Sequence, residues 1–174
     1  LESKERNTSL DDASLNEIAH NVANGTIRYE LIKPDLDKII TFDINTSLKL
    51  EGDTCSYIQY SCVRAARILE KSDKKPDFNA SFDQLNTEHD LNLIKQIGMF
   101  EIFVNDAAKN YSPKVIAKYC YGLAVTFSSF YEHVKVLKAE TPELVNARLC
   151  LVLSFGLTLE KALDLLGITV PQRM

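Results

Sequence analysis

Two tyrosines and three basic residues share one face of a helix that the sequence predicts over residues 54–71. At about 100° of rotation per residue, spacings of three and four residues keep five side chains within one narrow stripe. Its members are Tyr57, Tyr60, Arg64, Arg67 and Lys71. Aromatic rings stack on unpaired bases, guanidinium groups hold phosphates or base edges, and a lysine adds a point charge. The stripe is therefore typical of a surface that binds single-stranded RNA.

The opposite side of the same helix is aliphatic and predicts a face that packs against a core. It carries Ile58, Cys62, Ala65 and Leu69. Charged helix faces are more often only solvated, so a second interpretation of the stripe stays open. In that interpretation, the cations pair with Glu70 or Asp73 and the tyrosines rest on neighbouring helices.

Residues that commonly bind metals or perform catalysis show no useful spacing in this chain. The four cysteines and three histidines are scattered, so we expect no metal site and buried free thiols. They are Cys55, Cys62, Cys120, Cys150, His20, His89 and His133. The carboxylates of Glu17, Glu30 and Glu51 form no acid–base pair, and the usual phosphate-loop, nucleophile and zinc motifs do not occur. We predict no catalytic residue.

The composition is that of an ordinary globular domain, with 45% hydrophobic and 25% charged residues in a chain of 174. A net charge of −4 argues against nonspecific nucleic-acid binding, which depends on a broad positive field, but it allows a local basic stripe. No apolar run approaches the roughly 20 residues of a membrane span, and residues 1–6 are too polar for a signal peptide. We expect no membrane association and a cytoplasmic location.

Capping and helix-breaking signals predict where several elements begin and end. A capping box at residues 14–17 opens the first helix, and Pro34 ends it. Residues 39–42 form a short apolar run that is either a strand or an extended linker. The polar stretch 72–86 is a loop, and Thr87 begins another helix.

Two further start signals, Ser112-Pro113 and Thr141-Pro142, open the last two helices. The helix that begins at Thr141-Pro142 runs toward Leu166 and stops at Gly167. The helix that begins at Ser112-Pro113 carries an apolar seam at alternating steps of four and three, namely Ile116, Cys120, Leu123, Phe127, Phe130 and Val134. Four or five helices and no convincing strand follow Thr54, so the fold class is all-α, a helical bundle.

A series of segments from Gly25 to the last residue follows the pattern of one family. They are Gly25-Thr26-Ile27-Arg28-Tyr29, Phe42-Asp43, Leu50-Glu51-Gly52, Tyr57-Ile58-Gln59-Tyr60 with Arg64, Ser112-Pro113, residues 119–124, residues 127–131, Ala147-Arg148-Leu149, residues 165–168, Pro171 and Met174. Their order resembles the junction between the catalytic and anticodon-binding domains of arginyl-tRNA synthetases, followed by the anticodon-binding domain itself.

The resemblance implies a division into two parts. Residues 1–52 correspond to the end of the catalytic domain and a linker, with helical and extended stretches. Residues 53–174 correspond to a helical anticodon-binding domain of the type named for Asp-Ala-Leu-Arg, where this chain has Asn146-Ala147-Arg148-Leu149. The full-length enzyme would use ATP and magnesium, but this fragment has no cofactor. It also lacks the H-x-G-H and K-M-S-K-S motifs, so we expect it to be inactive alone.

The partners that the resemblance implies are the anticodon loop of arginine tRNA and the chain's own catalytic domain, in a monomer. The residues carried over by position are Tyr57, Tyr60, Arg64, Tyr131 and Met174, and together with Gln59, Arg67 and Lys71 they make up the predicted tRNA contacts. The sequence departs from the family at Cys55-Ser56, where Gly-Pro is usual, and at Ser61-Cys62-Val63. Two other interpretations stay open, an accessory module derived from a synthetase and a helical scaffold with no role in RNA binding.

Overall fold

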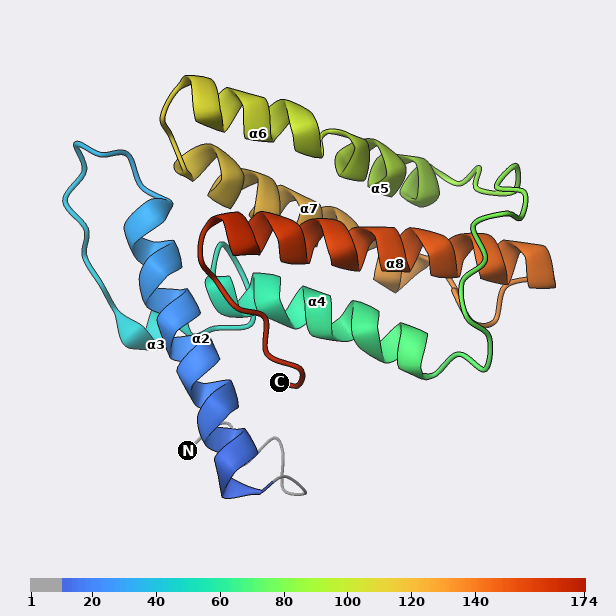
Figure 1. The fold of residues 1–174 in the computed structure, drawn as a ribbon, viewed down its shortest axis with the longest axis horizontal. Coiled ribbons are helices and arrows are strands. Elements are labelled where there is room, and N and C mark those ends of the chain that lie inside the picture. Colours follow the sequence, from blue (N-terminus) through green and yellow to red (C-terminus); the bar gives the residue numbers. More distant parts are fainter. Residues whose placement is uncertain (1–10) are drawn as a thin grey trace.

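The computed structural model describes residues 11–174, and within that range it consists of helices and connecting segments without a strand (Figure 1). The helices are α2 (Asp12–Ile32), α3 (Ile44–Ser47), α4 (Cys55–Glu70), α5 (Glu88–Gly98), α6 (Phe100–Lys109), α7 (Lys114–His133) and α8 (Pro142–Leu165). The prediction of an all-α bundle is confirmed. The prediction about residues 1–6 lies outside the described residues.

The bundle is built around three long helices that pack on one another. α4 packs on α8, α8 packs on α7, and α5 and α6 cover the outer side of α7. α2 crosses this group at a steep angle and packs mainly on α4 (Figure 1). The helix with the predicted stripe therefore lies between the N-terminal helix and the centre of the bundle.

The seam predicted on α7 forms the middle of the core. Each of its six residues is less than one-tenth exposed. The rings of Phe127 and Phe155, from α7 and α8, stack with 3.8 Å between their centroids and an interplanar angle of 7°. Aromatic side chains bury the largest apolar areas in a core, so this pair joins the two helices firmly.

α8 is long and apolar enough to cross a membrane, judged by length and composition alone. It packs against α4, α5 and α7, which accounts for its apolar composition. Its fully buried residues include Ala147, Leu149, Val152, Phe155, Leu159, Ala162 and Leu163.

Three threonines cap the helices that the sequence predicted from them. The hydroxyl oxygens of Thr54, Thr87 and Thr141 accept hydrogen bonds from backbone N–H groups three residues further on, at 3.1–3.2 Å. Gly167 follows α8 with a φ of +66°, a conformation that favours glycine and ends the helix. The predicted boundaries of α4 and α8 are therefore confirmed to within a residue or two.

Two local predictions were wrong. α2 begins at Asp12, because the carboxylate of Asp11 caps it by accepting from the Ser14 N–H at 2.7 Å; the predicted box starts three residues too late. Ser112 does not cap α7, because Pro113 occupies the cap position and no side chain makes a capping bond. Residues 39–42 form an exposed linker, which is one of the two alternatives predicted for them, and the short helix α3 after them was not predicted.

Candidate nucleic-acid interface

The two faces of α4 have the characters that its sequence predicts. Ile58, Cys62 and Ala65 are buried, and Leu69 packs against the same core while half-buried. On the other side, Tyr57, Tyr60 and Arg64 are half-buried, whereas Arg67 and Lys71 are exposed. The stripe therefore reaches from the bundle surface into solvent over the length of the helix.

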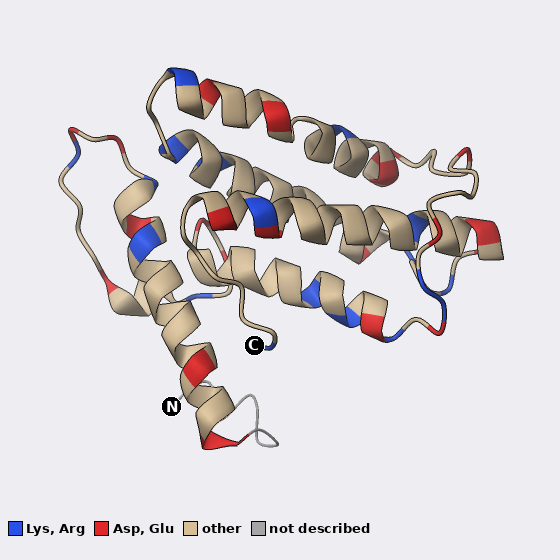
Figure 2. Cartoon of the chain, viewed as in Figure 1, with Lys and Arg blue, Asp and Glu red and all other residues tan. Residues whose placement is uncertain are grey.

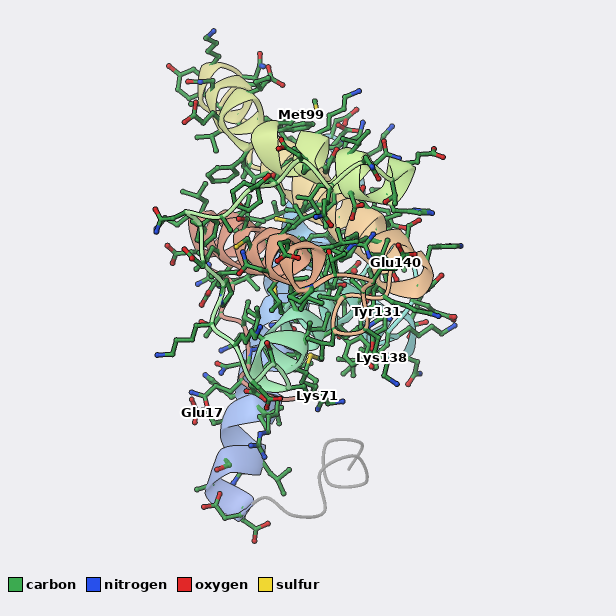
Figure 3. The ribbon with its side chains drawn as sticks, turned by 90° about the vertical axis from the view of Figure 1, so that its right-hand side faces the viewer. Glu17, Lys71, Met99, Tyr131, Lys138 and Glu140 are labelled. Atoms are coloured by element: carbon green, nitrogen blue, oxygen red, sulfur yellow. The ribbon has the colours of Figure 1, made fainter. Side chains whose placement is uncertain are left out.

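Arg64 is the centre of a stacked arrangement that joins α4 to α7. Its guanidinium carbon lies 3.8 Å from the ring centroid of Tyr131 and 5.7 Å from that of Tyr60. Its Nη1 donates to the hydroxyl of Ser128 at 3.3 Å. Guanidinium groups within about 6 Å of an aromatic face are attracted by the ring quadrupole. Tyr131 is 43% exposed, so the arrangement stays open to solvent (Figure 3).

The cations of the stripe are not neutralised by the acids close to them in sequence. Within residues 11–174, no Asp or Glu carboxylate oxygen lies within 4.0 Å of a basic nitrogen of Arg64, Arg67 or Lys71. The interpretation in which these cations pair with Glu70 or Asp73 is therefore wrong. The charges of Arg64 and Lys71 are available to a ligand, whereas Arg67 also binds the last residue of the chain.

One tyrosine of the stripe is partly committed to packing. Tyr57 meets Tyr121 of α7 edge-on, with 6.1 Å between centroids and an interplanar angle of 60°. Its position agrees with the part of the second interpretation in which tyrosines rest on a neighbouring helix. The partners from α7, Tyr121 and Ser128, could not be inferred from spacing along α4, because only the packing of the two helices brings them there.

Gln59 is the predicted site residue that the structure removes from the exposed surface. Its side chain is fully buried, and its Nε2 donates to the backbone carbonyls of Asn21 at 3.3 Å and Thr169 at 2.7 Å. Since it lies on the side of α4 that faces α2, it cannot meet a ligand on the stripe. Its contacts join the N-terminal helix, α4 and the C-terminal segment.

The C-terminal segment lies against α4 and ends beside the stripe. Pro171 is buried, and Val170 packs against the core. The Nη2 of Arg67 donates to the backbone carbonyl of Met174 at 3.1 Å. Tyr131 and Met174 therefore approach the stripe separately, the first through Arg64 and the second through Arg67.

The cysteines are free and buried, as the sequence predicted. Burial raises the pKa of the Cys55 thiol to about 12 and raises the pKa values of Cys62 and Cys120 as well, so these thiols stay protonated at neutral pH. Within residues 11–174, no group of three or more His, Cys, Asp or Glu side chains could hold a metal ion.

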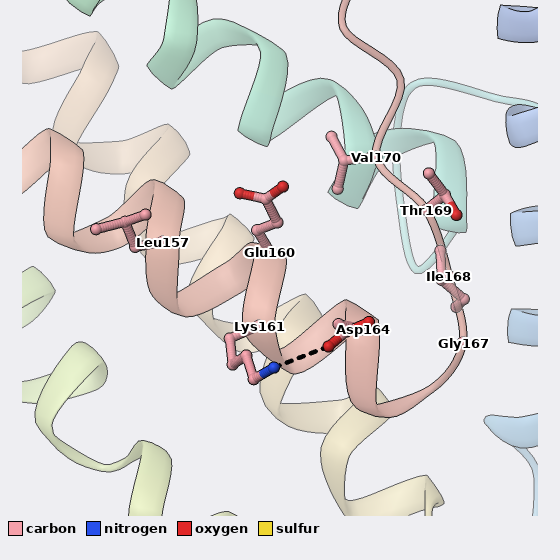
Figure 4. A pocket seen from close by; sticks show the side chains of 8 residues that line it. All are labelled: Leu157, Glu160, Lys161, Asp164, Gly167, Ile168, Thr169 and Val170. Atoms are coloured by element: carbon pink, nitrogen blue, oxygen red, sulfur yellow. Dashed lines mark hydrogen bonds and ion pairs between the residues drawn. The ribbon is translucent and has the colours of Figure 1, made fainter.

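A separate hollow lies between the last turns of α8 and the segment that follows them (Figure 4). Its charged side chains include Lys161 and Asp164, which form an ion pair at 2.9 Å. Neither cysteine nor histidine is among its lining residues, which are Leu157, Glu160, Lys161, Asp164, Gly167, Ile168, Thr169 and Val170. It offers less specific chemistry than the stripe.

The chain is a helical bundle with an open surface of basic and aromatic side chains. Residues 58–174 match the family model described as the DALR anticodon binding domain. The chain belongs to this family.

The chain is also similar to much longer proteins. It is 36% identical over 174 residues to the arginine–tRNA ligase of Methanothrix thermoacetophila, covering all of this chain and 31% of the relative. It is 35% identical over 158 residues to the arginine–tRNA ligase of Streptococcus pneumoniae, covering 91% and 28%. The structure of Thermus thermophilus arginyl-tRNA synthetase matches with a TM-score of 0.86 and 34% identity, covering 98% and 29%. This chain spans about 30% of the length of these relatives.

Proposed function

We propose that this chain is the anticodon-binding part of an arginine–tRNA ligase and that the α4 stripe contacts the anticodon loop of arginine tRNA. The observation that carries the proposal is the unneutralised Arg64, which lies over the Tyr131 ring and near the Tyr60 ring on an open surface. Unpaired bases of a loop stack on aromatic rings and guanidinium planes. Tyr57, Arg67 and Lys71 lie on the same face of α4 as this centre, and Met174 contacts Arg67, whereas the buried Gln59 is left out of the proposed contact surface.

The division at residue 52 belongs to the same proposal. Several large apolar side chains between α2 and α4 are exposed, namely Leu36, Ile39, Ile40, Phe42 and Ile44. Exposed apolar groups in one segment mark an interaction site, and the preceding domain of the longer ligases is the partner that fits. That domain would bind ATP and magnesium and attach arginine. We further propose that the chain works as part of a cytoplasmic monomer and forms no adenylate alone.

Substitutions within the stripe test its role through two different measurements. Tyr60→Ala should weaken binding of arginine tRNA by about 1–3 kcal/mol, because a stacking surface is lost, and leave the salt dependence unchanged. Arg64→Ala should weaken binding and also lower the slope of log K against log salt by about one unit, as loss of a phosphate contact would. Binding is measured by fluorescence anisotropy over a series of salt concentrations.

Tyr111→Ala is the matched control, because this tyrosine is 90% exposed between α6 and α7, away from the stripe. It should bind like the parent chain. If Tyr60→Ala and Arg64→Ala fold normally and also bind like the parent, the stripe is not the tRNA contact. The chain would then be better described as a helical scaffold or an accessory module.

A further inference from the structure

The segment that follows α7 buries two valines and exposes two lysines. Val134 and Val136 are buried, at 8% and 7% exposure, while Lys135 and Lys138 are exposed. Val134 has extended backbone angles, φ −113° and ψ 123°, so its side chain and that of Lys135 point to opposite sides, and Lys138 lies in the turn that follows. Two buried valines thereby anchor a short segment that presents cations to solvent.

A buried ion pair fixes the backbone of the same segment. Arg148 of α8 donates from Nε and Nη2 to the two carboxylate oxygens of Asp90, at 3.3 and 3.4 Å. Its Nη1 donates to the backbone carbonyl of Lys135 at 3.2 Å. Asp90 is fully buried and Arg148 is 8% exposed. One guanidinium therefore ties the start of α5 and the lysine segment to α8.

This segment lies at the end of the bundle where the α4 stripe also ends. Figure 1 shows the connection after α7 and the loop after α4 at the same end, and Figure 3 shows Lys71, Tyr131 and Lys138 together on that side. Residues 64–75 contain five cations and two carboxylates. Basic positions mark both connections in Figure 2, although the chain as a whole is acidic.

The acidic residues of this end leave the two lysines unneutralised. Glu132 and Glu140 flank the segment in sequence. In the part of the chain that the structure describes, however, no carboxylate oxygen lies within 4.0 Å of the Lys135 or Lys138 ammonium group. A lysine in this setting acts as a compact point charge that suits phosphate oxygens.

We propose that residues 134–138 form a second RNA contact, in which Lys135 and Lys138 bind phosphates of the RNA backbone next to the loop held by the stripe. Arg148 is the positioning residue for this contact, because it holds the Lys135 backbone without itself reaching the surface. The inference rests on the proposed function. It extends the binding surface from α4 and α7 to the connection between α7 and α8.

The test compares two double variants that remove the same charge at opposite ends of α7. In K135Q/K138Q, the slope of log K against log salt for arginine tRNA should fall by about one to two units, since each lost phosphate contact removes roughly 0.7–0.9. In K109Q/K118Q, which alters exposed lysines at the end of α6 and in the first turns of α7, the slope should equal that of the parent.

Equal slopes in the two double variants would overturn the inference. If Tyr60→Ala weakens binding in the same series, the proposed function survives and only the second contact is lost. A parent chain that binds no arginine tRNA would instead overturn the proposed function and the inference together.

Arg148→Lys tests the positioning role at unchanged net charge. Lysine keeps a cation beside Asp90 but lacks the guanidinium fork that also reaches the Lys135 carbonyl. Its salt slope should move toward that of K135Q/K138Q, and adding Arg148→Lys to K135Q/K138Q should lower the slope no further, because both changes act on one contact. Additive losses would show that Arg148 does not act through these lysines.

Discussion

Arg148 stabilises the fold through its ion pair with Asp90 and also holds the backbone of the exposed Lys135. In the part of the chain described here, its guanidinium is the only cation in contact with the buried Asp90 carboxylate. Asp90 also accepts from the Thr87 hydroxyl and backbone, at 2.6 and 3.2 Å, as part of the capping box of α5. Removing the arginine would leave a buried charge without its counter-ion.

We therefore expect Arg148→Met to lower the free energy of unfolding by about 3–5 kcal/mol, the usual cost of breaking a buried ion pair from one side. Chemical denaturation followed by circular dichroism measures the loss. The variant Asp90→Asn/Arg148→Met, which removes both charges, should recover part of it. If the double variant is no more stable than the single one, the isolated charge is not the cause.

Residue spacing correctly predicted which face of α4 is exposed, but one residue assigned to the binding site, Gln59, is buried. The steps of three and four correctly separated the stripe from Ile58 and Cys62, because that separation depends only on helical geometry. Gln59 was assigned to the surface from its place in a motif. Its burial depends on how α2 and the C-terminal segment pack on α4, which no local pattern contains.

At the scale of elements, the contact between α2 and α4 depends on a glycine. A Cβ atom on Gly25 would lie 2.8 Å from the Gln59 Nε2 and 2.9 Å from the Cys55 Sγ. Real Cβ atoms do not approach neighbours so closely, and the Gln59 side chain is held by two hydrogen bonds. Gly25 therefore permits the two helices to pack at this distance.

Gly25→Ala should consequently destabilise the chain by about 1–3 kcal/mol through overpacking, in spite of the better helix propensity of alanine. Gly156→Ala is the matched control, since Gly156 is also inside a helix but its nearest neighbour would be 4.0 Å from the new Cβ. It should stabilise by up to about 1 kcal/mol. Thermal unfolding of the two variants measures the difference, and effects of the same sign would contradict this account.

Helix starts were predictable where a single threonine satisfied the first free N–H groups, as at Thr54, Thr87 and Thr141. The start of α2 was misplaced because Asp11 and Ser14 are both good capping residues, and local sequence does not say which one the helix uses. The approach of α5 and α6 to α7, by contrast, results from tertiary packing and had no local signal.

For the molecule as a whole, the proposed boundary at residue 52 does not coincide with a boundary in the core. Tyr29 of α2 is fully buried within the core cluster of the bundle. Its hydroxyl donates to the Asp53 carboxylate at 2.6 Å and lies 3.2 Å from the Ala117 carbonyl, and an ion pair joins Lys114 to Asp35. α2 is thus part of the same packed unit as α4 and α7.

This continuity predicts that the chain unfolds as one cooperative unit although its two parts are expected to belong to different domains of a longer protein. Opening α2 alone would expose Tyr29 and leave Gln59 without one of its two acceptors, so it would remove part of the core of the bundle. In hydrogen exchange followed by mass spectrometry at rising denaturant concentrations, the protected amides of α2 and α4 should converge on one opening free energy. Tyr29→Ala, which removes the ring that α2 contributes to the core, should separate the two values by loosening α2 first. If α2 already opens at a much lower denaturant concentration than α4 in the parent chain, the N-terminal helix is only docked on the bundle. The proposed domain boundary at residue 52 would then also separate two units that unfold independently.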